Sequence, residues 1–180
     1  MQIGTDGGVI IEAWDEIDHD ILVRAFRAED ELSKLLLLTF EVEAQLDQFI
    51  KKILGEDISR LKFYEKCIVL KAIRFGNDVF KIVDGLRQLR NKFAHDKTAS
   101  FAKYSKLVDQ VINAKPPIFD DVSRFTFAVG KSEKIPYTQL TTDQKLVIFG
   151  IATAQFLSAA PELYDFPPPR AKIQMKGAML

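Results

Sequence analysis

An arginine and a histidine stand five residues apart near the middle of the chain, in the run "LRQLRNKFAHD". Arg90 is followed directly by Asn91, and His95 comes just before the run ends. An arginine can bind an anion through its planar fork of donors. A histidine can give or take a proton near neutral pH. These residue types therefore make the run the first candidate for chemistry in this sequence.

Arg90 occupies an unusual place on its predicted helix. On a helical wheel that starts at Val79 and advances about 100° per residue, Arg90 falls near 20°, inside the apolar stripe, while Asn91 falls near 120° and His95 near 160°. A charge in an apolar stripe is costly unless it is paired or can reach water or an anion. Two explanations stay open: Arg90 belongs to an anion site, or it pairs with a carboxylate of the long upstream helix. The possible partners are Glu41, Glu43 and Asp47.

Basic residues gather around this run. They are Arg87, Lys92, Lys97, Lys103 and Lys106, with only Asp84 and Asp96 of opposite charge between them. Such a local excess can guide a nucleic-acid backbone, or it can be a solvated face of a helix. Phe101 and Tyr104 follow closely, and we expect them to pack in the next helix rather than to stack on bases.

The helical period dominates the rest of the chain. Apolar residues recur at three- and four-residue spacing from Ala28 to Leu54, which predicts a long amphipathic helix that stops at Gly55. Further helices are predicted over Ile58–Arg74, over Val79–His95, from Ser100 to before Pro116, and over Thr142–Leu157 or beyond. No strands alternate with helices, so the sequence predicts an all-α bundle of four to five helices with a less regular C-terminal segment.

The sequence also predicts two helix caps and the structure of two less regular segments. Asn77 or Asp78 can cap the third of these helices, and Thr141 or Thr142 the last. The segment 10–27 fits a helix with an acidic, solvated face. The segment 116–140 fits either a short helix or a small hairpin from "RFTFAV" to "KIPYTQL".

Composition excludes several classes of protein. The 25 basic and 25 acidic residues give a formal net charge of zero, so any anion site must be local. Cys67 is the single cysteine, which excludes an internal disulfide and a cysteine-based zinc cluster, and its apolar neighbours predict a core residue. The first residues do not resemble a signal peptide, and no apolar run is long enough to span a bilayer. We expect a cytoplasmic protein without a metal or other cofactor and without membrane contact.

The run Arg90-Asn91-Lys92-Phe93-Ala94-His95 at a helix end resembles the Arg-x4-His motif of the HEPN superfamily. The longer string "DGLRQLRNKFAHD" is similar to HEPN proteins in its letters as well. The leucine-rich helix upstream resembles the mannitol-repressor-like branch of that superfamily. The resemblance covers roughly residues 28–114, about half of the chain. Together with the acidic segment before it and the proline run near the C-terminus, this predicts an acidic N-terminal helix or extension (1–27), a helical HEPN-like domain (28–166, core 28–114) and a flexible tail (167–180).

The resemblance implies a function and a set of roles. HEPN domains commonly form homodimers, and many are metal-independent endoribonucleases that serve as toxins or defence effectors. Two Arg-x4-His motifs then meet across the dimer interface in one composite site. Carried over by position, His95 would be the general acid or base, Arg90 would bind the scissile phosphate, and Asn91 would orient the phosphate or the imidazole. RNA would be the substrate and a 2′,3′-cyclic phosphate the product end, with Arg87, Lys92 and Lys97 as further RNA-binding residues.

The resemblance also implies an alternative. Some HEPN domains keep the helical platform and lack catalysis, and mannitol-repressor-like proteins are linked to regulation of sugar-alcohol uptake. Some HEPN toxins carry a tyrosine two residues after the histidine, which a partner nucleotidyltransferase modifies, whereas this chain has Lys97 there. That difference argues against this form of toxin–antitoxin control. The alternative is therefore a non-catalytic regulator or interaction module, with an antitoxin or a regulatory protein as a possible partner of either form.

Overall fold

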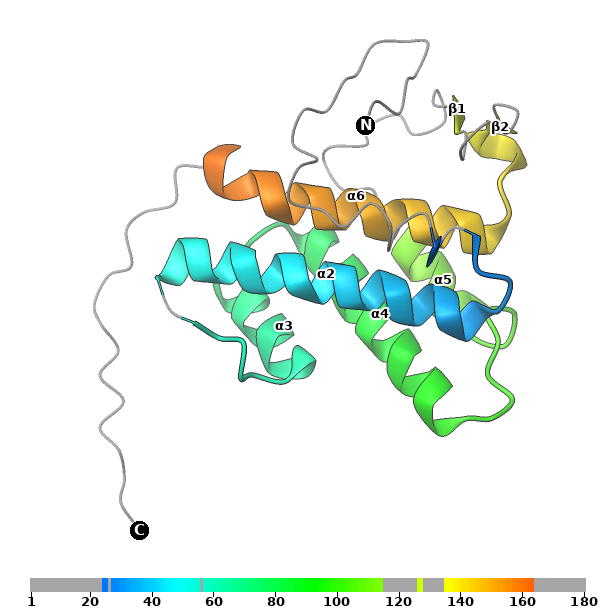
Figure 1. Cartoon of the computed structure of the whole chain (residues 1–180), viewed down its shortest axis with the longest axis horizontal. Coiled ribbons are helices and arrows are strands. Elements are labelled where there is room, and N and C mark those ends of the chain that lie inside the picture. The colour runs from blue at the N-terminus through cyan, green and yellow to red at the C-terminus, as the bar shows by residue number, and fades with distance from the viewer. Residues whose placement is uncertain (1–23, 26, 56, 115–125, 128–134, 164–180) are drawn as a thin grey trace.

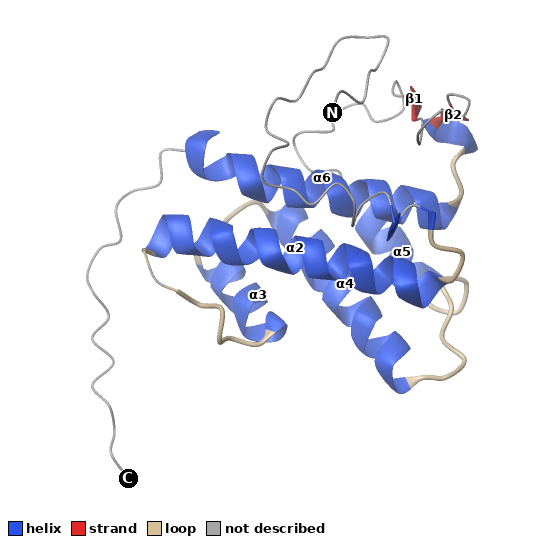
Figure 2. Cartoon of the chain, in the orientation of Figure 1, coloured by secondary structure: helices blue, strands red, loops and turns tan. Residues whose placement is uncertain are grey.

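The protein is an all-α bundle, as the sequence predicts (Figures 1 and 2). The computed structural model describes residues 24–25, 27–55, 57–114, 126–127 and 135–163. Five α-helices lie in these ranges: α2 (Glu31–Leu54), α3 (Phe63–Ala72), α4 (Asn77–His95), α5 (Ser105–Ile112) and α6 (Thr142–Leu163). Most of the predicted N-terminal extension and the whole predicted tail lie outside the described residues.

The ends of the longest helices follow from local hydrogen bonding. Helix α2 begins after Asp30, whose Oδ1 accepts a hydrogen bond from the Ser33 amide at 2.7 Å. It ends at the predicted Gly55, which adopts the left-handed conformation with φ of 69°. Helix α6 begins after Thr141, whose amide donates to the Gln144 side chain at 2.9 Å while its hydroxyl accepts from the Gln144 amide. The predicted threonine cap is therefore confirmed at Thr141.

Other helix boundaries differ from the prediction. Helix α3 begins at Phe63 rather than at Ile58, because the Lys62 amide donates to the Glu65 carboxylate at 2.7 Å and starts the helix there. The prediction that Asn77 or Asp78 caps α4 is wrong. Gly76, with φ of 41°, precedes the helix, and Asn77 is already its first residue.

Helices α2 and α6 form the largest helix–helix contact and lie side by side (Figure 1). Gly150 of α6 makes this close approach possible, because a Cβ there would lie 2.2 Å from Cδ1 of the buried Leu38. An ion pair between Lys34 and Asp143 joins the same two helices. The rings of Phe49, Phe75 and Phe156 continue the core toward the start of α4.

Helix α4 contacts all four other helices, so its position and rotation are fixed from several directions. Its buried face consists of Val79, Ile82, Val83, Gly85, Leu86 and Leu89. Gly85 allows α5 to approach, since a Cβ there would lie 2.5 Å from Val111 Cγ2. The run from Leu86 to His95 therefore lies on a helix that is packed against four others.

The segment between α5 and α6 contains a short antiparallel ladder. Strand β1 (Thr126–Phe127) pairs with β2 (Ile135–Pro136), with Thr126 opposite Pro136. This pairing matches the predicted hairpin, and a single 3-10 turn (η4, Tyr137–Gln139) follows β2. The rest of the segment, 115–125 and 128–134, lies outside the described residues. No helix in the described residues is long and apolar enough to cross a membrane.

Candidate functional site

Arg90 is half-buried and pairs with the long helix. Its Nη1 donates to Glu43 Oε2 at 3.3 Å, and its side chain keeps 33% of its exposure. Its guanidinium carbon also lies 5.7 Å from the ring centroid of Phe40, which is 55% exposed. Of the three carboxylates that the sequence offered as partners, the structure selects Glu43. The other two have different partners: Glu41 accepts a hydrogen bond from Gln45, and Asp47 pairs with a lysine of α3.

That lysine is Lys66, and it links Arg90 to a larger charge network. Lys66 Nζ donates to Glu43 Oε1 at 3.0 Å and to Asp47 Oδ2 at 2.8 Å, while its side chain keeps only 4% of its exposure. Burial raises the pKa of Asp47, and the attraction of Lys66 offsets only part of that rise. For Lys66, burial lowers the pKa, but the hydrogen bonds to the two carboxylates outweigh it and the pKa is raised. Lys66 therefore holds its charge inside the bundle.

His95 and Asn91 lie in a different environment, at the exposed end of α4. Both are exposed, and both line an open groove of about 470 Å³. The other residues that line this groove are Gln88, Lys92, Asp96 and Tyr104. Within the described part of the chain, no hydrogen bond or ion pair engages the His95 imidazole. Arg90 does not line this groove, so one chain does not bring Arg90 and His95 together.

The loop after His95 is fixed by the carboxylate of Asp96. Asp96 accepts hydrogen bonds from Lys103 Nζ and from the Tyr104 hydroxyl, both at 2.6 Å, and from the Thr98 amide at 3.0 Å. These hydrogen bonds hold the pKa of Asp96 well below its usual range. The hydrogen bond to Asp96 also raises the pKa of Tyr104. The groove beside His95 therefore has a pre-formed wall on its loop side.

The predicted RNA-binding residues are placed unequally. Arg87 pairs with Asp84 at 2.8 Å and lies over the exposed ring of Tyr64, so its charge is partly neutralised. Lys92 and Lys97 are exposed, and Lys92 Nζ lies 5.8 Å from the ring centroid of Tyr104 in the groove. The local excess of positive charge is therefore smaller than the sequence suggests, since Lys103 is also paired.

Phe101, Tyr104 and Cys67 all have a role in packing. Phe101 is buried against Phe93, with ring centroids 5.4 Å apart, and its amide donates to Glu31 at the start of α2. Tyr104 is half-buried with its hydroxyl bonded to Asp96. The prediction that both pack is confirmed, but the prediction that they belong to the next helix is wrong, because α5 begins at Ser105 rather than at Ser100. Cys67 is 2% exposed, and burial raises its pKa to about 12, so the predicted core role is confirmed as well.

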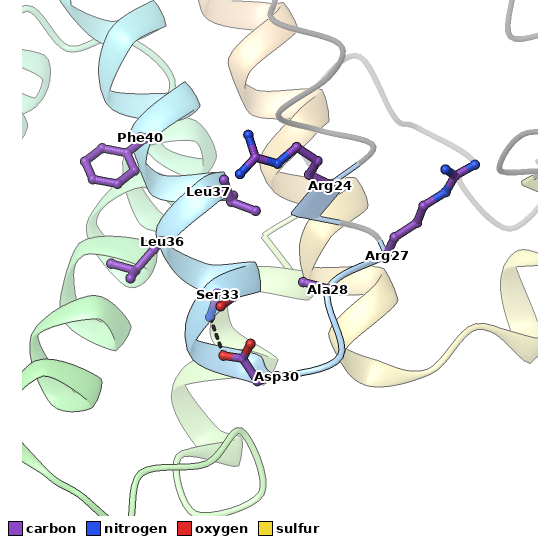
Figure 3. A pocket seen from close by; sticks show the side chains of 8 residues that line it. All are labelled: Arg24, Arg27, Ala28, Asp30, Ser33, Leu36, Leu37 and Phe40. Atoms are coloured by element: carbon purple, nitrogen blue, oxygen red, sulfur yellow. Dashed lines mark hydrogen bonds between the residues drawn. The ribbon is translucent and has the colours of Figure 1, made fainter.

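A second groove, of about 570 Å³, lies at the start of α2 (Figure 3). Its apolar part consists of Leu36, Leu37 and Phe40, and Arg24 and Arg27 stand at its other side. Sequence reasoning did not point to this groove. Phe40 lines this groove and also lies under the guanidinium of Arg90, so one side chain is shared by the groove and the charge network between α2 and α4.

Comparison with known proteins assigns this chain to no family. No protein-family model, no curated protein and no solved structure matches this chain. The described residues contain no group of three or more His, Cys, Asp or Glu that could hold a metal ion.

Proposed function

We propose that this protein is a metal-independent endoribonuclease of the HEPN type that acts as a homodimer. The observation that carries the proposal is the exposure of His95 and Asn91 together near the C-terminal end of α4, a helix packed against four others. An unpaired imidazole at such a position is available for proton transfer. Lys92 in the same groove supplies a charge that attracts an RNA backbone.

The chemistry needs few groups. His95 of one subunit takes the proton of the 2′-hydroxyl, and the oxygen attacks the neighbouring phosphorus. Arg90 binds the phosphate oxygens as charge develops on them. The leaving 5′-oxygen takes a proton from an acid, and a 2′,3′-cyclic phosphate remains. Asn91 holds the phosphate or the imidazole in place.

The proposal needs two copies of the chain. A single motif supplies one histidine, whereas the reaction uses a base and an acid. Arg90 also lies on the side of α4 that faces α2, away from the groove of His95. A second subunit placed against the exposed face of α4 would bring another Arg90 and another His95 to the same phosphate.

The test is RNA cleavage by the purified protein in EDTA, with total tRNA and a mixed mRNA as substrates. We expect 2′,3′-cyclic phosphate ends, and a loss of about 100- to 1,000-fold in rate for His95→Gln and for Arg90→Ala. Lys51→Ala is the matched control, because Lys51 is an exposed cation in the last turn of α2 and lies outside the proposed site. Cleavage that survives both site substitutions would place the activity elsewhere or in a contaminant.

A non-catalytic regulator or interaction module is the second candidate. The pair of Arg90 with Glu43 favours it, because an arginine held by its own chain is a structural element as well as an anion binder. A folded homodimer that cleaves none of a wide range of RNAs would favour this candidate over the endoribonuclease.

A further inference from the structure

The ion pair between Arg90 and Glu43 is the weakest contact of its charge network. It rests on one hydrogen bond of 3.3 Å, and both side chains are partly exposed, at 33% for Arg90 and 21% for Glu43. The neighbouring bond of Lys66 to Asp47 is 2.8 Å long and is made by a nearly inaccessible lysine. Partly exposed pairs of this kind contribute little to stability, because water screens the two charges. The ion pair between Arg90 and Glu43 is therefore the contact of this network that breaks most readily.

Glu43 stays neutralised when this pair opens. Its two oxygens serve different cations, since Oε2 accepts from Arg90 while Oε1 accepts from Lys66 at 3.0 Å. Breaking a buried pair is costly mainly because it leaves an uncompensated charge behind. Here Lys66 remains bound to the carboxylate, and water can reach the oxygen that Arg90 leaves. Because Lys66 stays bound to Glu43, breaking the ion pair between Arg90 and Glu43 costs little free energy.

Arg90 also has a surface along which it can move. Its guanidinium lies over the exposed ring of Phe40, which belongs to the groove at the start of α2. A guanidinium keeps its attraction to an aromatic face over a range of positions within about 6 Å of the ring centre. Arg90 can therefore turn toward a ligand at the surface without losing this contact.

We propose that Glu43 is a positioning residue that restrains Arg90 and competes with the ligand's phosphate for its guanidinium. A phosphate binds when it displaces the Glu43 carboxylate from Arg90, and Lys66 then holds Glu43 alone. The identification of the ligand as RNA rests on the proposed function, whereas the competition itself needs only a phosphate group.

The first test measures binding of a short fluorescein-labelled 2′-O-methyl RNA by fluorescence anisotropy. This probe has no free 2′-hydroxyl to attack its phosphates, so binding is measured without cleavage. Glu43→Gln should tighten binding about two- to fivefold, because the competing pair is worth at most about 1 kcal/mol. The charge-matched control is Asp78→Asn, which removes one carboxylate from an exposed pair with Lys81 at the other end of α4. The gain should disappear when Glu43→Gln is combined with Arg90→Ala.

Three results would overturn the inference. Glu43→Gln could bind no more tightly than Asp78→Asn, the gain could persist without Arg90, or the substitution could weaken binding. Thermal melts of each variant show whether its fold is intact before binding is compared. Glu43→Gln keeps the shape of the side chain, and Lys66 keeps Asp47 as a partner.

A second test separates failure of this inference from failure of the RNA assignment. Inorganic phosphate is titrated while the Arg90 Nε–H resonance is followed by NMR, with the resonance assigned by its loss in Arg90→Lys. We expect phosphate to shift it at lower concentration in Glu43→Gln than in the native protein. If the RNA probe does not bind but phosphate behaves this way, the restraint by Glu43 stands and the RNA assignment falls. If phosphate shifts this resonance in neither protein, or equally in both, the restraint is wrong.

Discussion

Two cations share the carboxylate of Glu43, and the structure predicts that they contribute very differently to stability. The matched perturbations are Lys66→Met and Arg90→Met, since each removes the charge and keeps most of the apolar stem. Lys66 is almost fully buried and serves two carboxylates at 3.0 and 2.8 Å. Arg90 is one-third exposed and serves one carboxylate at 3.3 Å.

The magnitudes follow from what each substitution leaves behind. Without Lys66, Glu43 and Asp47 keep their charges with less compensation, and Asp47 Oδ1 already lies buried without a hydrogen-bond partner. Removing one member of a buried pair in this way costs about 3–5 kcal/mol. Without Arg90, Glu43 retains Lys66, and the cost is about 1 kcal/mol or less. For a chain of this size the corresponding falls in Tm are roughly 6–20 °C and below about 4 °C.

Urea unfolding followed by far-ultraviolet circular dichroism measures both free energies directly. Arg90→Met as destabilising as Lys66→Met would refute this reasoning. Arg90 would then be a structural residue, and a loss of activity on its substitution would carry no information about chemistry. Small effects for both would mean that water reaches the network more freely than the burial of Lys66 implies.

The same pair of variants predicts a dependence on pH. Burial raises the pKa of Asp47, and Lys66 is the group that opposes this rise. Removing Lys66 should raise the pKa of Asp47 further, so that its folded-state pKa exceeds its unfolded value by more. An acid whose pKa is raised by folding destabilises the protein once pH rises above that pKa. The loss in free energy of unfolding caused by Lys66→Met should therefore become smaller as the solution is made more acidic. The loss caused by Arg90→Met should change less with pH.

Three further predictions concern the surroundings of the site. Gly150→Ala should destabilise the protein by about 1–2 kcal/mol in urea unfolding, because its Cβ would overlap Leu38 and the overpacking outweighs the better helix propensity of alanine; an unchanged or higher stability would mean that α2 and α6 are packed less closely. Cys67 should react with a thiol reagent only after unfolding, since it is buried and its pKa is raised to about 12; fast labelling of the native protein would contradict its place in the core. Asp96→Asn should lower Tm at neutral pH, and the difference in Tm from the native protein should become smaller as pH falls below 3.8. The reason is that a carboxylate with a depressed pKa stabilises the fold above its unfolded pKa and loses this effect as it is protonated. A difference in Tm that is constant with pH would mean that the hydrogen bonds of Asp96 do not depend on its charge.

The sequence predicted the long helices because their signals are local. The apolar spacing of α2 and the glycine after it depend only on residues close in the chain, as does the threonine that precedes α6. The start of α3 was missed by five residues, since it depends on one hydrogen bond between Lys62 and Glu65 that competes with a helical pattern extending further upstream. Lys66 was also missed, because a lysine that follows Glu65 and precedes Cys67 gives no sign of burial in its own sequence.

The partner of Arg90 shows where sequence reasoning stops. The apolar stripe demanded a partner or a ligand for this charge, and three carboxylates of α2 were equally acceptable on that ground. The choice among them depends on the rotation of α2 about its axis, which is set by the packing of Leu38 against Gly150 and by the other tertiary contacts. One signal was available: Glu43 and Asp47 are four residues apart and share a helix face, so two cations were needed on that side.

The division of the motif between two environments limits what can bind to it. Arg90 is restrained by Glu43 of α2, which Lys66 of α3 also holds, whereas His95 depends on the last turn of α4 and on the loop held by Asp96. Along an α-helix the two residues are about 7.5 Å apart in rise and about 140° apart in rotation, with the exposed Asn91 between them. A lone phosphate is too small to contact both side chains of one chain at that separation. A ligand that uses the whole motif must therefore extend across the exposed face of α4, as an RNA strand would, or it must take Arg90 and His95 from different subunits. Under the proposed function, both conditions put the ligand-binding surface at Asn91 and its side of α4, and substitutions on that surface should affect function without affecting stability.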